Sequence, residues 1–206
     1  MNPHARPVGS RRRTLLAAAL ATGLLAACSE QQGAAAPFAG IDITGADYAT
    51  GFQLTDHNGQ QRTLADFKGK VVVVFFGYTQ CPDVCPTSLG ELAEAKRLLG
   101  ADGDKLQGLF VSVDPARDTP EVMKQYMASF DPSFLALYTT ADGLPELAKR
   151  FRVYYKKVDG QTATSYTMDH SAGSYVYDTQ GRVRLYTRYG SGAPALAGDV
   201  KKLLAE

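Results

Sequence analysis

The chain has 206 residues, 45% of them hydrophobic, and a formal net charge of +1. This length suits one sizeable domain and is short for two. Residues 1–27 hold four arginines and no acidic residue, so their removal leaves 18 Lys and Arg against 21 Asp and Glu, a net charge of −3. This weak acidity argues against a nucleic-acid partner, which usually requires a basic face.

The N-terminal segment, residues 1–27, predicts a signal peptide of lipoprotein type. A positive region that ends at Arg13 precedes the apolar run TLLAAALATGLLAA, which is short for a transmembrane helix. The run Leu25-Ala26-Ala27-Cys28 resembles a lipobox, in which Cys28 becomes the lipidated first residue. The segment SRRRTLL also resembles a twin-arginine export signal, without its usual aromatic residue. We therefore expect a lipid anchor on the periplasmic side of a bacterial membrane. We expect the lipidated N-terminus and a flexible tether to cover residues 28–47, and one domain to cover residues 48–206.

The domain is expected to begin with a β-hairpin and a buried strand. Residues 51–64 alternate polar and apolar side chains around Asn58-Gly59, which is a strong tight-turn signal. We expect His57, in that turn, to be a solvated surface side chain. Val71–Phe76 is a continuous apolar run, which is typical of a central parallel strand covered on both faces.

Helical and extended patterns then alternate to the C-terminus. Leucines at helical spacing predict a helix after Pro86, and Thr119 is the expected N-cap of a helix from Pro120 through Phe130. The other expected elements are strands Leu106–Val113 and Phe134–Tyr138, a helix Leu144–Phe151, a hairpin of Ser174–Tyr177 and Arg182–Tyr186, and a closing helix Ala195–Leu204. This order predicts an α/β fold: a thioredoxin-like sandwich with a central mixed β-sheet flanked by helices and an N-terminal β-hairpin.

Cys81 and Cys85 lie in the motif CPDVC, where the Val71–Phe76 strand meets the following helix. Thiols at a helix N-terminus feel the positive end of the helix, which lowers their pKa and favours the thiolate. Thiolate is the nucleophile of disulfide exchange and also a metal ligand. Residues four apart on a helix have Cβ atoms roughly 5–6 Å apart, which is wide for a disulfide, although Pro82 and Pro86 would distort the turn. The pair is thus a candidate redox disulfide and a candidate metal site.

His170 is the candidate third ligand. It is expected in a polar loop before the Ser174–Tyr177 strand, and in a thioredoxin-like sheet this loop approaches the cysteines at the helix start. Two thiolates and an imidazole suit a soft, thiophilic metal, above all Cu(I). With Cys28 lipidated, Cys81 and Cys85 are the remaining cysteines, and a domain of this size does not need a disulfide for stability.

Three segments together resemble the signature blocks of the Sco/SenC family. They are FGYTQCPDVCPTSL, FVSVDPARDTPEVMKQYM and YTMDHSAGSYVYD, within a match that runs from about Phe52 to the C-terminus. Members are thioredoxin-fold copper proteins that serve cytochrome c oxidase assembly. The resemblance implies that Cys81, Cys85 and His170 bind one copper per chain, as Cu(I) or Cu(II). The implied partner is the copper A domain of oxidase subunit II. Further implied partners are another periplasmic copper chaperone or a thioredoxin-like reductant. The default expectation for the oligomeric state is a monomer.

Two other functions stay open beside a copper chaperone, which would need no catalytic residue. A thiol–disulfide reductase that keeps the cysteines of the target subunit reduced would use Cys81 and Cys85 and would not need His170. Against this alternative, no proline occurs between Pro145 and Pro194, where such enzymes usually carry a cis-proline. A redox or copper sensor would use the same three residues.

Three carboxylates are candidates for contacts behind the ligands or for partner docking. Asp114 ends a predicted strand on the same sheet edge as the cysteines, and its alternative role is to cap its own loop. Asp83 lies between the cysteines and is expected to be exposed to a basic partner. Asp169 precedes His170 and is a candidate to orient the imidazole, as carboxylates near metal-bound histidines often do.

Overall fold

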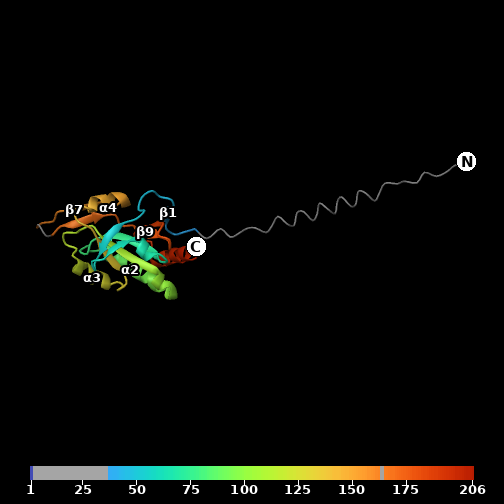
Figure 1. Cartoon of the computed structure of the whole chain (residues 1–206), viewed down its shortest axis with the longest axis horizontal. Helices are drawn as coiled ribbons and strands as arrows, with labels where there is room; N and C mark the ends of the chain where they lie inside the picture. The colour runs from blue at the N-terminus through green and yellow to red at the C-terminus, as the bar shows by residue number, and fades with distance from the viewer. Residues whose placement is uncertain (2–36, 163–164) are drawn as a thin grey trace. The chain divides into compact units, whose positions relative to one another are not determined.

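A mixed sheet of eight strands lies at the centre of the domain, in the order β1-β10-β9-β4-β5-β6-β2-β3 (Figure 1). The computed structural model describes Met1, residues 37–162 and residues 165–206; Cys28 and, apart from Met1, the predicted signal peptide lie outside these residues. Strands β4 (Val71–Gly77), β5 (Leu106–Ser112) and β6 (Leu135–Tyr138) are parallel to one another, and the remaining pairs are antiparallel. The remaining strands of this sheet are β1 (Ile41–Asp42), β2 (Gln53–Asp56), β3 (Gln61–Thr63), β9 (Ser174–Tyr177) and β10 (Val183–Thr187).

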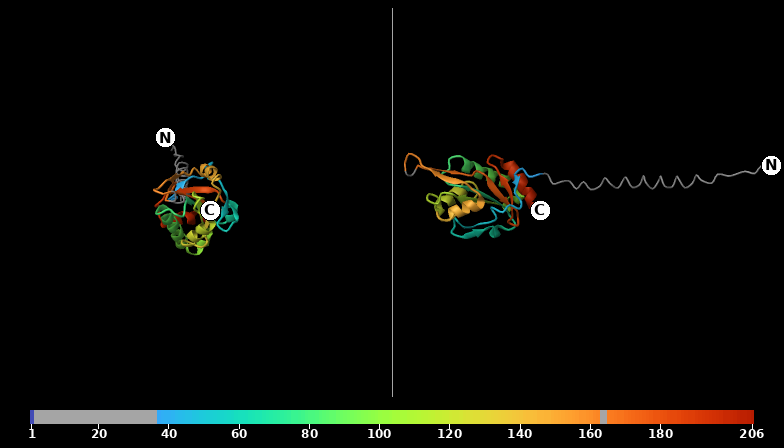
Figure 2. Two further views of the ribbon diagram at one scale, coloured as in Figure 1. Left: turned by 90° about the vertical axis from the view of Figure 1, so that its left-hand side faces the viewer. Right: turned by 90° about the horizontal axis from the view of Figure 1, so that it is seen from above.

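Strand β4 lies in the middle of the sheet, and all seven of its residues are buried. Its side chains alternate between two apolar clusters, one on each face of the sheet. Val72, Val74 and Phe76 pack on the face covered by η1 (Leu64–Phe67) and α4 (Leu144–Phe151). Val71, Val73 and Phe75 pack on the face covered by α2 (Val84–Leu98), α3 (Pro120–Ala128) and α5 (Ala193–Leu204) (Figure 2). The predicted α/β sandwich with a mixed central sheet is confirmed.

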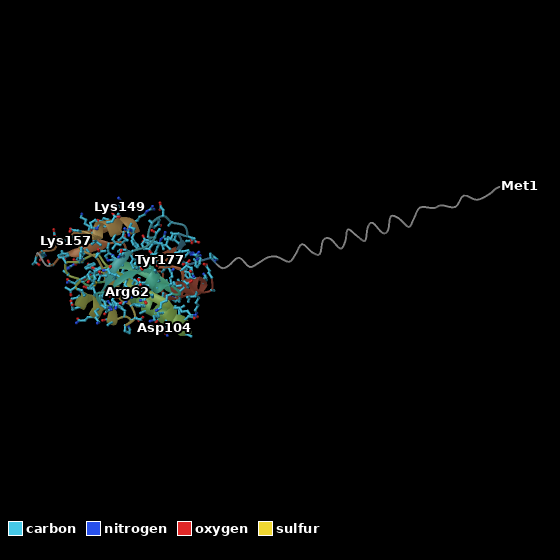
Figure 3. All side chains as sticks on the ribbon, viewed as in Figure 1. Met1, Arg62, Asp104, Lys149, Lys157 and Tyr177 are labelled. Atoms are coloured by element: carbon cyan, nitrogen blue, oxygen red, sulfur yellow. The ribbon has the colours of Figure 1, made fainter. Side chains whose placement is uncertain are left out.

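Tyr177, the last residue of β9, connects the sheet to the segment that precedes β2. Its side chain is fully buried, and its hydroxyl donates a hydrogen bond to the carbonyl oxygen of Ala49 at 2.7 Å. Figure 3 labels Tyr177 among the side chains of the domain. A buried phenol needs such a partner, because an unpaired hydroxyl in the core would cost free energy.

The ends of the helices follow local signals in the sequence. Thr119 caps α3 as predicted, because its side chain accepts a hydrogen bond from the backbone N–H of Val122 at 3.3 Å. Helix α2 begins at Val84, before the predicted start after Pro86, so that Cys85 lies in its first turn. A short 3₁₀ segment, η2 (Gly100–Lys105), connects α2 to β5. Among the described residues, no helix combines the length and apolar character needed to cross a membrane.

A two-stranded ribbon that the sequence did not predict stands apart from the main sheet. Strands β7 (Tyr155–Val158) and β8 (Thr167–His170) pair antiparallel with each other, in the register Tyr155 opposite His170. Figures 1 and 2 show both strands, in orange, at one end of the domain. His170 is therefore the last residue of a strand, and the expectation of a loop position was wrong.

Two N-terminal features differ from the sequence-based expectations. Residues 38–47 belong to the compact unit, whereas the tether was expected to extend to residue 47. They are held because the buried Asp199 carboxylate accepts the N–H groups of Ala39 and Gly40 at 2.9 and 2.8 Å, and because β1 pairs with β10. His57 is half-buried and not simply solvated: its Nδ1 accepts the N–H of Ala136 in β6 at 3.1 Å.

Candidate metal centre

Cys81 and Cys85 lie at the junction of β4 and α2. Cys81 precedes the helix and is partly exposed, whereas Cys85 is fully buried in the first helical turn. The predicted junction of strand and helix therefore holds Cys81 just before the helix and Cys85 within it. A Cβ atom on Gly77 would lie 2.6 Å from Cys85 Sγ, so the last residue of β4 must be small for this sulfur to fit.

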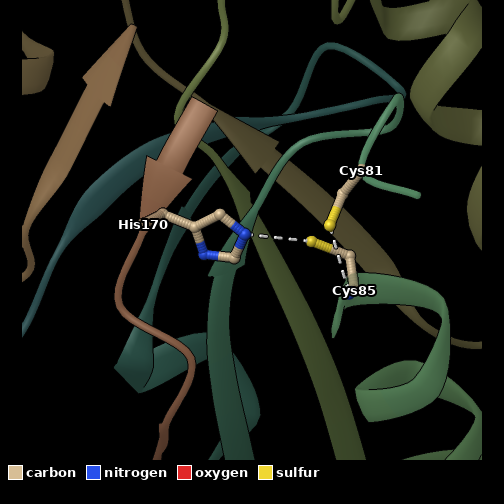
Figure 4. Close-up of side chains that lie close together, drawn as sticks. All are labelled: Cys81, Cys85 and His170. Carbon is tan, nitrogen blue, oxygen red and sulfur yellow. Dashed lines mark hydrogen bonds between the residues drawn. The ribbon is translucent and has the colours of Figure 1, made fainter. Parts of the chain in front are cut away.

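His170 points from the end of β8 toward the two sulfur atoms (Figure 4). Its Nε2 lies 3.3 Å from Cys85 Sγ, and the backbone N–H of Cys85 donates to Cys81 Sγ at 3.4 Å. The possible ligand atoms of the three residues all lie within 4.8 Å of one another. The structure thus brings together the three residues that the sequence singled out.

The imidazole of His170 is oriented by its neighbours. Its Nδ1 lies 2.9 Å from the carbonyl oxygen of Ser171; since a carbonyl can only accept, Nδ1 carries a proton. The Nε2 atom is therefore the one available to a metal. The rings of Tyr78 and Phe75 meet the imidazole edge-on, with centroids 5.8 and 6.1 Å from its own, and they restrict its rotation.

The two thiols differ strongly in acidity. The Cys85 thiol donates a hydrogen bond to Cys81, and this bond lowers the pKa of Cys81 to about 4, with further help from His170. The same bond, together with burial, raises the pKa of Cys85. The pKa of His170 is raised because the Cys81 sulfur and the Ser171 carbonyl stabilise the imidazolium more than burial disfavours it. In the metal-free protein, Cys81 is thus the thiolate of the pair.

The donor set fits a thiophilic metal ion. Thiolates select soft ions such as Cu(I), and imidazole is a good ligand for copper and zinc. Structural zinc sites almost always hold four protein ligands, whereas the group found within the described residues has three. The arrangement therefore suits copper better than structural zinc.

The three candidate carboxylates do not reach the ligand atoms. Asp83 is exposed and precedes α2 without a side-chain cap. Asp169 is exposed, and the Ser171 carbonyl takes the position at Nδ1 that a carboxylate was expected to fill. Asp114 is 3% exposed, and its Oδ2 accepts from Arg117 Nε at 2.5 Å. Of the three, only Asp114 is part of a buried network behind the site.

Sequence reasoning missed several side chains that support the site. Asp118 is buried and accepts hydrogen bonds from the Thr79 N–H at 3.1 Å and the Thr79 hydroxyl at 2.6 Å, close to Cys81 in the chain. Burial raises the pKa of Asp118. Arg117 contacts the chain just before β8. Two acids and an arginine clustered at the end of a buried strand, in DPARD, were the available signal.

Comparison with known proteins identifies similar chains. The model of the family described as SCO1/SenC matches residues 42–205. The "SCO2-like protein" of Rickettsia felis is 35% identical over 132 residues, which are 64% of this chain and 64% of that protein. "Protein SCO2, mitochondrial" of Saccharomyces cerevisiae is 39% identical over 133 residues, 64% of this chain and 44% of that protein. The match therefore spans less than two thirds of the length of either relative.

Solved structures resemble the domain over nearly their whole length. ScoI of Bradyrhizobium japonicum, solved with copper bound, is 44% identical with a TM-score of 0.69, covering 77% of this chain and 99% of that one. Apo Sco1 of Thermus thermophilus is 36% identical with a TM-score of 0.72, covering 83% and 99%. These similarities confirm the predicted thioredoxin-like fold.

Proposed function

The chain belongs to the SCO1/SenC family, and on this premise we propose that it is a copper chaperone that serves the assembly of cytochrome c oxidase. The convergence of Cys81, Cys85 and His170 within 4.8 Å is the observation that carries the proposal. Copper bound to the similar ScoI of Bradyrhizobium japonicum supports the choice of metal. We propose one copper per chain, carried as cargo between the two thiolates and the imidazole.

The unequal exposure of the cysteines suits transfer by ligand exchange. Cys81 is partly exposed, and Cys85 is fully buried. An acceptor thiolate can therefore reach the copper from the Cys81 side, while Cys85 and His170 still hold it. Each incoming ligand replaces one donor ligand, so Cu(I) moves without a change of oxidation state. The proposed acceptor is the copper A domain of oxidase subunit II, and another periplasmic copper chaperone is the proposed source.

Lipidation at Cys28 and a position on the periplasmic side of a bacterial membrane complete the proposal. Its support is the lipobox-like run Leu25-Ala26-Ala27-Cys28 after an apolar segment. A lipid at this position would hold the domain at a membrane surface. Mass spectrometry of the membrane-extracted protein tests the anchor, since it would reveal a diacylglyceryl-modified N-terminal Cys28.

The test of the chaperone function is copper transfer between purified proteins. The Cu(I)-loaded full chain is mixed under anaerobic conditions with the reduced, copper-free copper A domain, the two are separated, and copper is measured in each. We expect most of the copper to leave the chain and to need direct contact, so that a dialysis membrane between the proteins slows the transfer. Copper that stays on the chain, or equal rates across the membrane, would contradict a chaperone.

A thiol–disulfide reductase is the second candidate, and the acidity of the thiols favours it. The Cys81 thiolate, with a pKa of about 4, would attack a disulfide of the target subunit and form a mixed disulfide, releasing one target thiolate. Cys85 would lose its proton, attack Cys81 and release the second target thiolate. The chain would then carry the Cys81–Cys85 disulfide, which a thioredoxin-like reductant must reduce.

Trapping separates this candidate from the chaperone. In Cys85→Ser the resolving thiol is absent, so a reductase would accumulate a mixed disulfide between Cys81 and the oxidised copper A domain. Cys81→Ser is the matched control, because it removes the exposed nucleophile and retains the buried thiol. Absence of any covalent complex in Cys85→Ser would exclude the reductase as the main function.

A further inference from the structure

The ribbon that carries His170 has no backbone pairing with the main sheet. Strands β7 and β8 pair only with each other among the described strands. A two-stranded ribbon is marginally stable without further support. Contacts of side chains are therefore expected to hold the ribbon: Met168 is buried in the main apolar cluster, and further contacts lie at the base of the ribbon.

Three side chains form a compact cluster at that base, which we call the Arg117 clamp: Asp114, Arg117 and Tyr166. Arg117 Nη1 donates to the carbonyl oxygen of Tyr166 at 2.9 Å, and the guanidinium lies 3.5 Å from the centroid of the Tyr166 ring. Tyr166 Oη donates to Asp114 Oδ1 at 2.8 Å, and Arg117 Nε donates to Asp114 Oδ2 at 2.5 Å. Tyr166 immediately precedes β8, so the clamp holds the chain four residues before His170.

The same guanidinium also reaches the cysteine segment. Arg117 Nη1 lies 3.1 Å from Gln80 Oε1, next to Cys81 in the chain. The Arg117 guanidinium lies 5.6 Å from the ring centroid of Tyr78, the ring that packs edge-on against His170. Arg117 is thus a direct connection between the loop that holds Cys81 and the strand that ends at His170.

Burial indicates that the clamp contributes geometry more than stability. The Asp114 and Arg117 side chains are 4% and 14% exposed, and Arg117 Nη2 is buried without a hydrogen-bond partner in the described residues. A buried ion pair loses most of its Coulombic gain to desolvation, and an unpaired buried donor adds a cost. Arginine is nonetheless suited to this position, because its planar fork can bind a carboxylate and stack on an aromatic ring at once.

We propose that the Arg117 clamp is a positioning device that sets the distance of His170 from Cys81 and Cys85. This inference rests on the proposed copper binding. The cysteines are carried by the β4–α2 junction, outside the ribbon, and Arg117 reaches them only through the exposed contact with Gln80. Loss of the clamp therefore removes the imidazole from the site and leaves the thiols in place. Cu(II), which needs the imidazole, is then bound less tightly, whereas Cu(I), which soft thiolates select, is retained.

The central variant is Arg117→Met in the full chain, which keeps an apolar stem and removes the guanidinium. We expect Cu(II) affinity to fall by about 10–100-fold, the range found when groups that orient metal ligands are removed. We expect Cu(I) affinity to fall much less than Cu(II) affinity, and the nitrogen coupling of His170 in the electron paramagnetic resonance spectrum of the Cu(II) form to be lost. Arg117→Lys keeps the positive charge and lacks the planar guanidinium that stacks on Tyr166. It is expected to rescue only part of the Cu(II) affinity.

The matched control is Arg62→Met. Arg62 also pairs with a buried carboxylate, that of Asp56, at 2.8 Å, but it lies on β3 at the far edge of the sheet. Removing either guanidinium leaves a buried carboxylate without its cationic partner, so the two variants share that stability cost. Only the Arg117 variant is expected to change Cu(II) binding. Tyr166→Phe, which loses one hydroxyl, replaces Arg117→Met if that variant does not fold.

A double-mutant cycle with His170→Ala identifies the route of the effect. If the clamp acts through the imidazole, Arg117→Met weakens Cu(II) binding no further once His170 is absent. Equal losses of Cu(I) and Cu(II) affinity, or additive losses in the double variant, would overturn the proposal. Wild-type protein that binds no copper would instead refute the proposed function. If the wild type binds copper but Arg117→Met behaves like Arg62→Met, the clamp alone is refuted.

Discussion

His170 Nε2 lies 3.3 Å from Cys85 Sγ, although 85 residues separate the two side chains in the sequence. Cys85 is held by α2 against the main sheet, and His170 is held by the separate β7–β8 ribbon. The donor set is therefore assembled by tertiary packing between two independent pieces of backbone. Changes at either piece are expected to alter metal binding in different ways.

Gly77→Ala is expected to disturb the cysteine side of the site. The added methyl group would lie 2.6 Å from Cys85 Sγ and 2.8 Å from Phe110. Both neighbours are fully buried, so they have little room to move. We expect a loss of about 1–3 kcal/mol in the free energy of unfolding, which is typical of overpacking, together with weaker copper binding. Urea denaturation and a copper titration measure the two effects.

Gly90→Ala is the control for the same chemical change. Gly90 lies in α2, and an added Cβ there meets no atom within 4 Å. Alanine in a helix interior is expected to stabilise by about 0.5–1 kcal/mol relative to glycine. If Gly77→Ala is as harmless as Gly90→Ala, the close packing of Cys85 against β4 is refuted.

Cys81 is expected to react much faster than Cys85 with iodoacetamide in the reduced, metal-free protein. Its pKa of about 4 means that the thiolate persists as the pH falls from 8 to 5, and Cys85 has no exposed surface. The labelling rate of Cys81 should therefore hardly change over this range, whereas that of a free thiol falls by nearly tenfold per pH unit. Peptide mapping by mass spectrometry assigns the labelled residue.

The hydrogen bond with the Cys85 side chain is the main reason for the low pKa of Cys81. Cys85→Ser keeps a hydrogen-bond donor at this position, whereas Cys85→Ala removes it. We expect the pKa of Cys81 to rise in the alanine variant and to rise less in the serine variant. Identical labelling profiles in the two variants would show that another group controls the acidity of Cys81.

His57 is expected to make the fold less stable in mild acid. Burial, with a smaller contribution from Lys124, holds the pKa of His57 below its ordinary value of 6.5. The unfolded chain then binds a proton at a higher pH than the folded chain does. The contribution of His57 to stability is therefore full above pH 6.5 and is lost as the pH falls from there through the folded pKa. Urea denaturation between pH 7.5 and 5 measures the change.

His57→Asn isolates this contribution, because the amide oxygen can still accept the Ala136 N–H and does not titrate. The comparison is made in metal-free His170→Ala protein, since the raised pKa of His170 acts in the opposite direction. We expect the loss of stability in acid to be smaller in the His57→Asn variant. Parallel pH profiles would mean that burial does not lower the pKa of His57.

Local patterns were sufficient to predict the core of the fold and the two cysteines of the site. The apolar run of β4 marked the central strand, and CPDVC followed it directly, so the cysteines could be placed at a helix start. His170 was placed near them only through the order of elements in a thioredoxin-like sheet. Helix α2 begins three residues earlier than the position after Pro86 suggested, because proline is well tolerated in the first turn of a helix.

The β7–β8 ribbon could not be predicted, because its stability comes from side chains outside it. The sequence of β7, YKKV, has one partly buried and three exposed residues, so it lacks a regular apolar face. In β8 only Met168 is buried. Arg117 contacts the ribbon from a loop 49 residues before Tyr166. A contact of this range leaves no periodic signal in either segment.

The most direct measurement of the proposed copper site is a copper titration of the full chain, reduced and anaerobic, beside its His170→Ala variant. We expect one tightly bound copper per wild-type chain. We also expect the variant to lose Cu(II) affinity. This loss should exceed the about 10–100-fold cost of removing a group that only orients a ligand. Copper binding that is weak, or that is the same with and without His170, would contradict a site built from Cys81, Cys85 and His170.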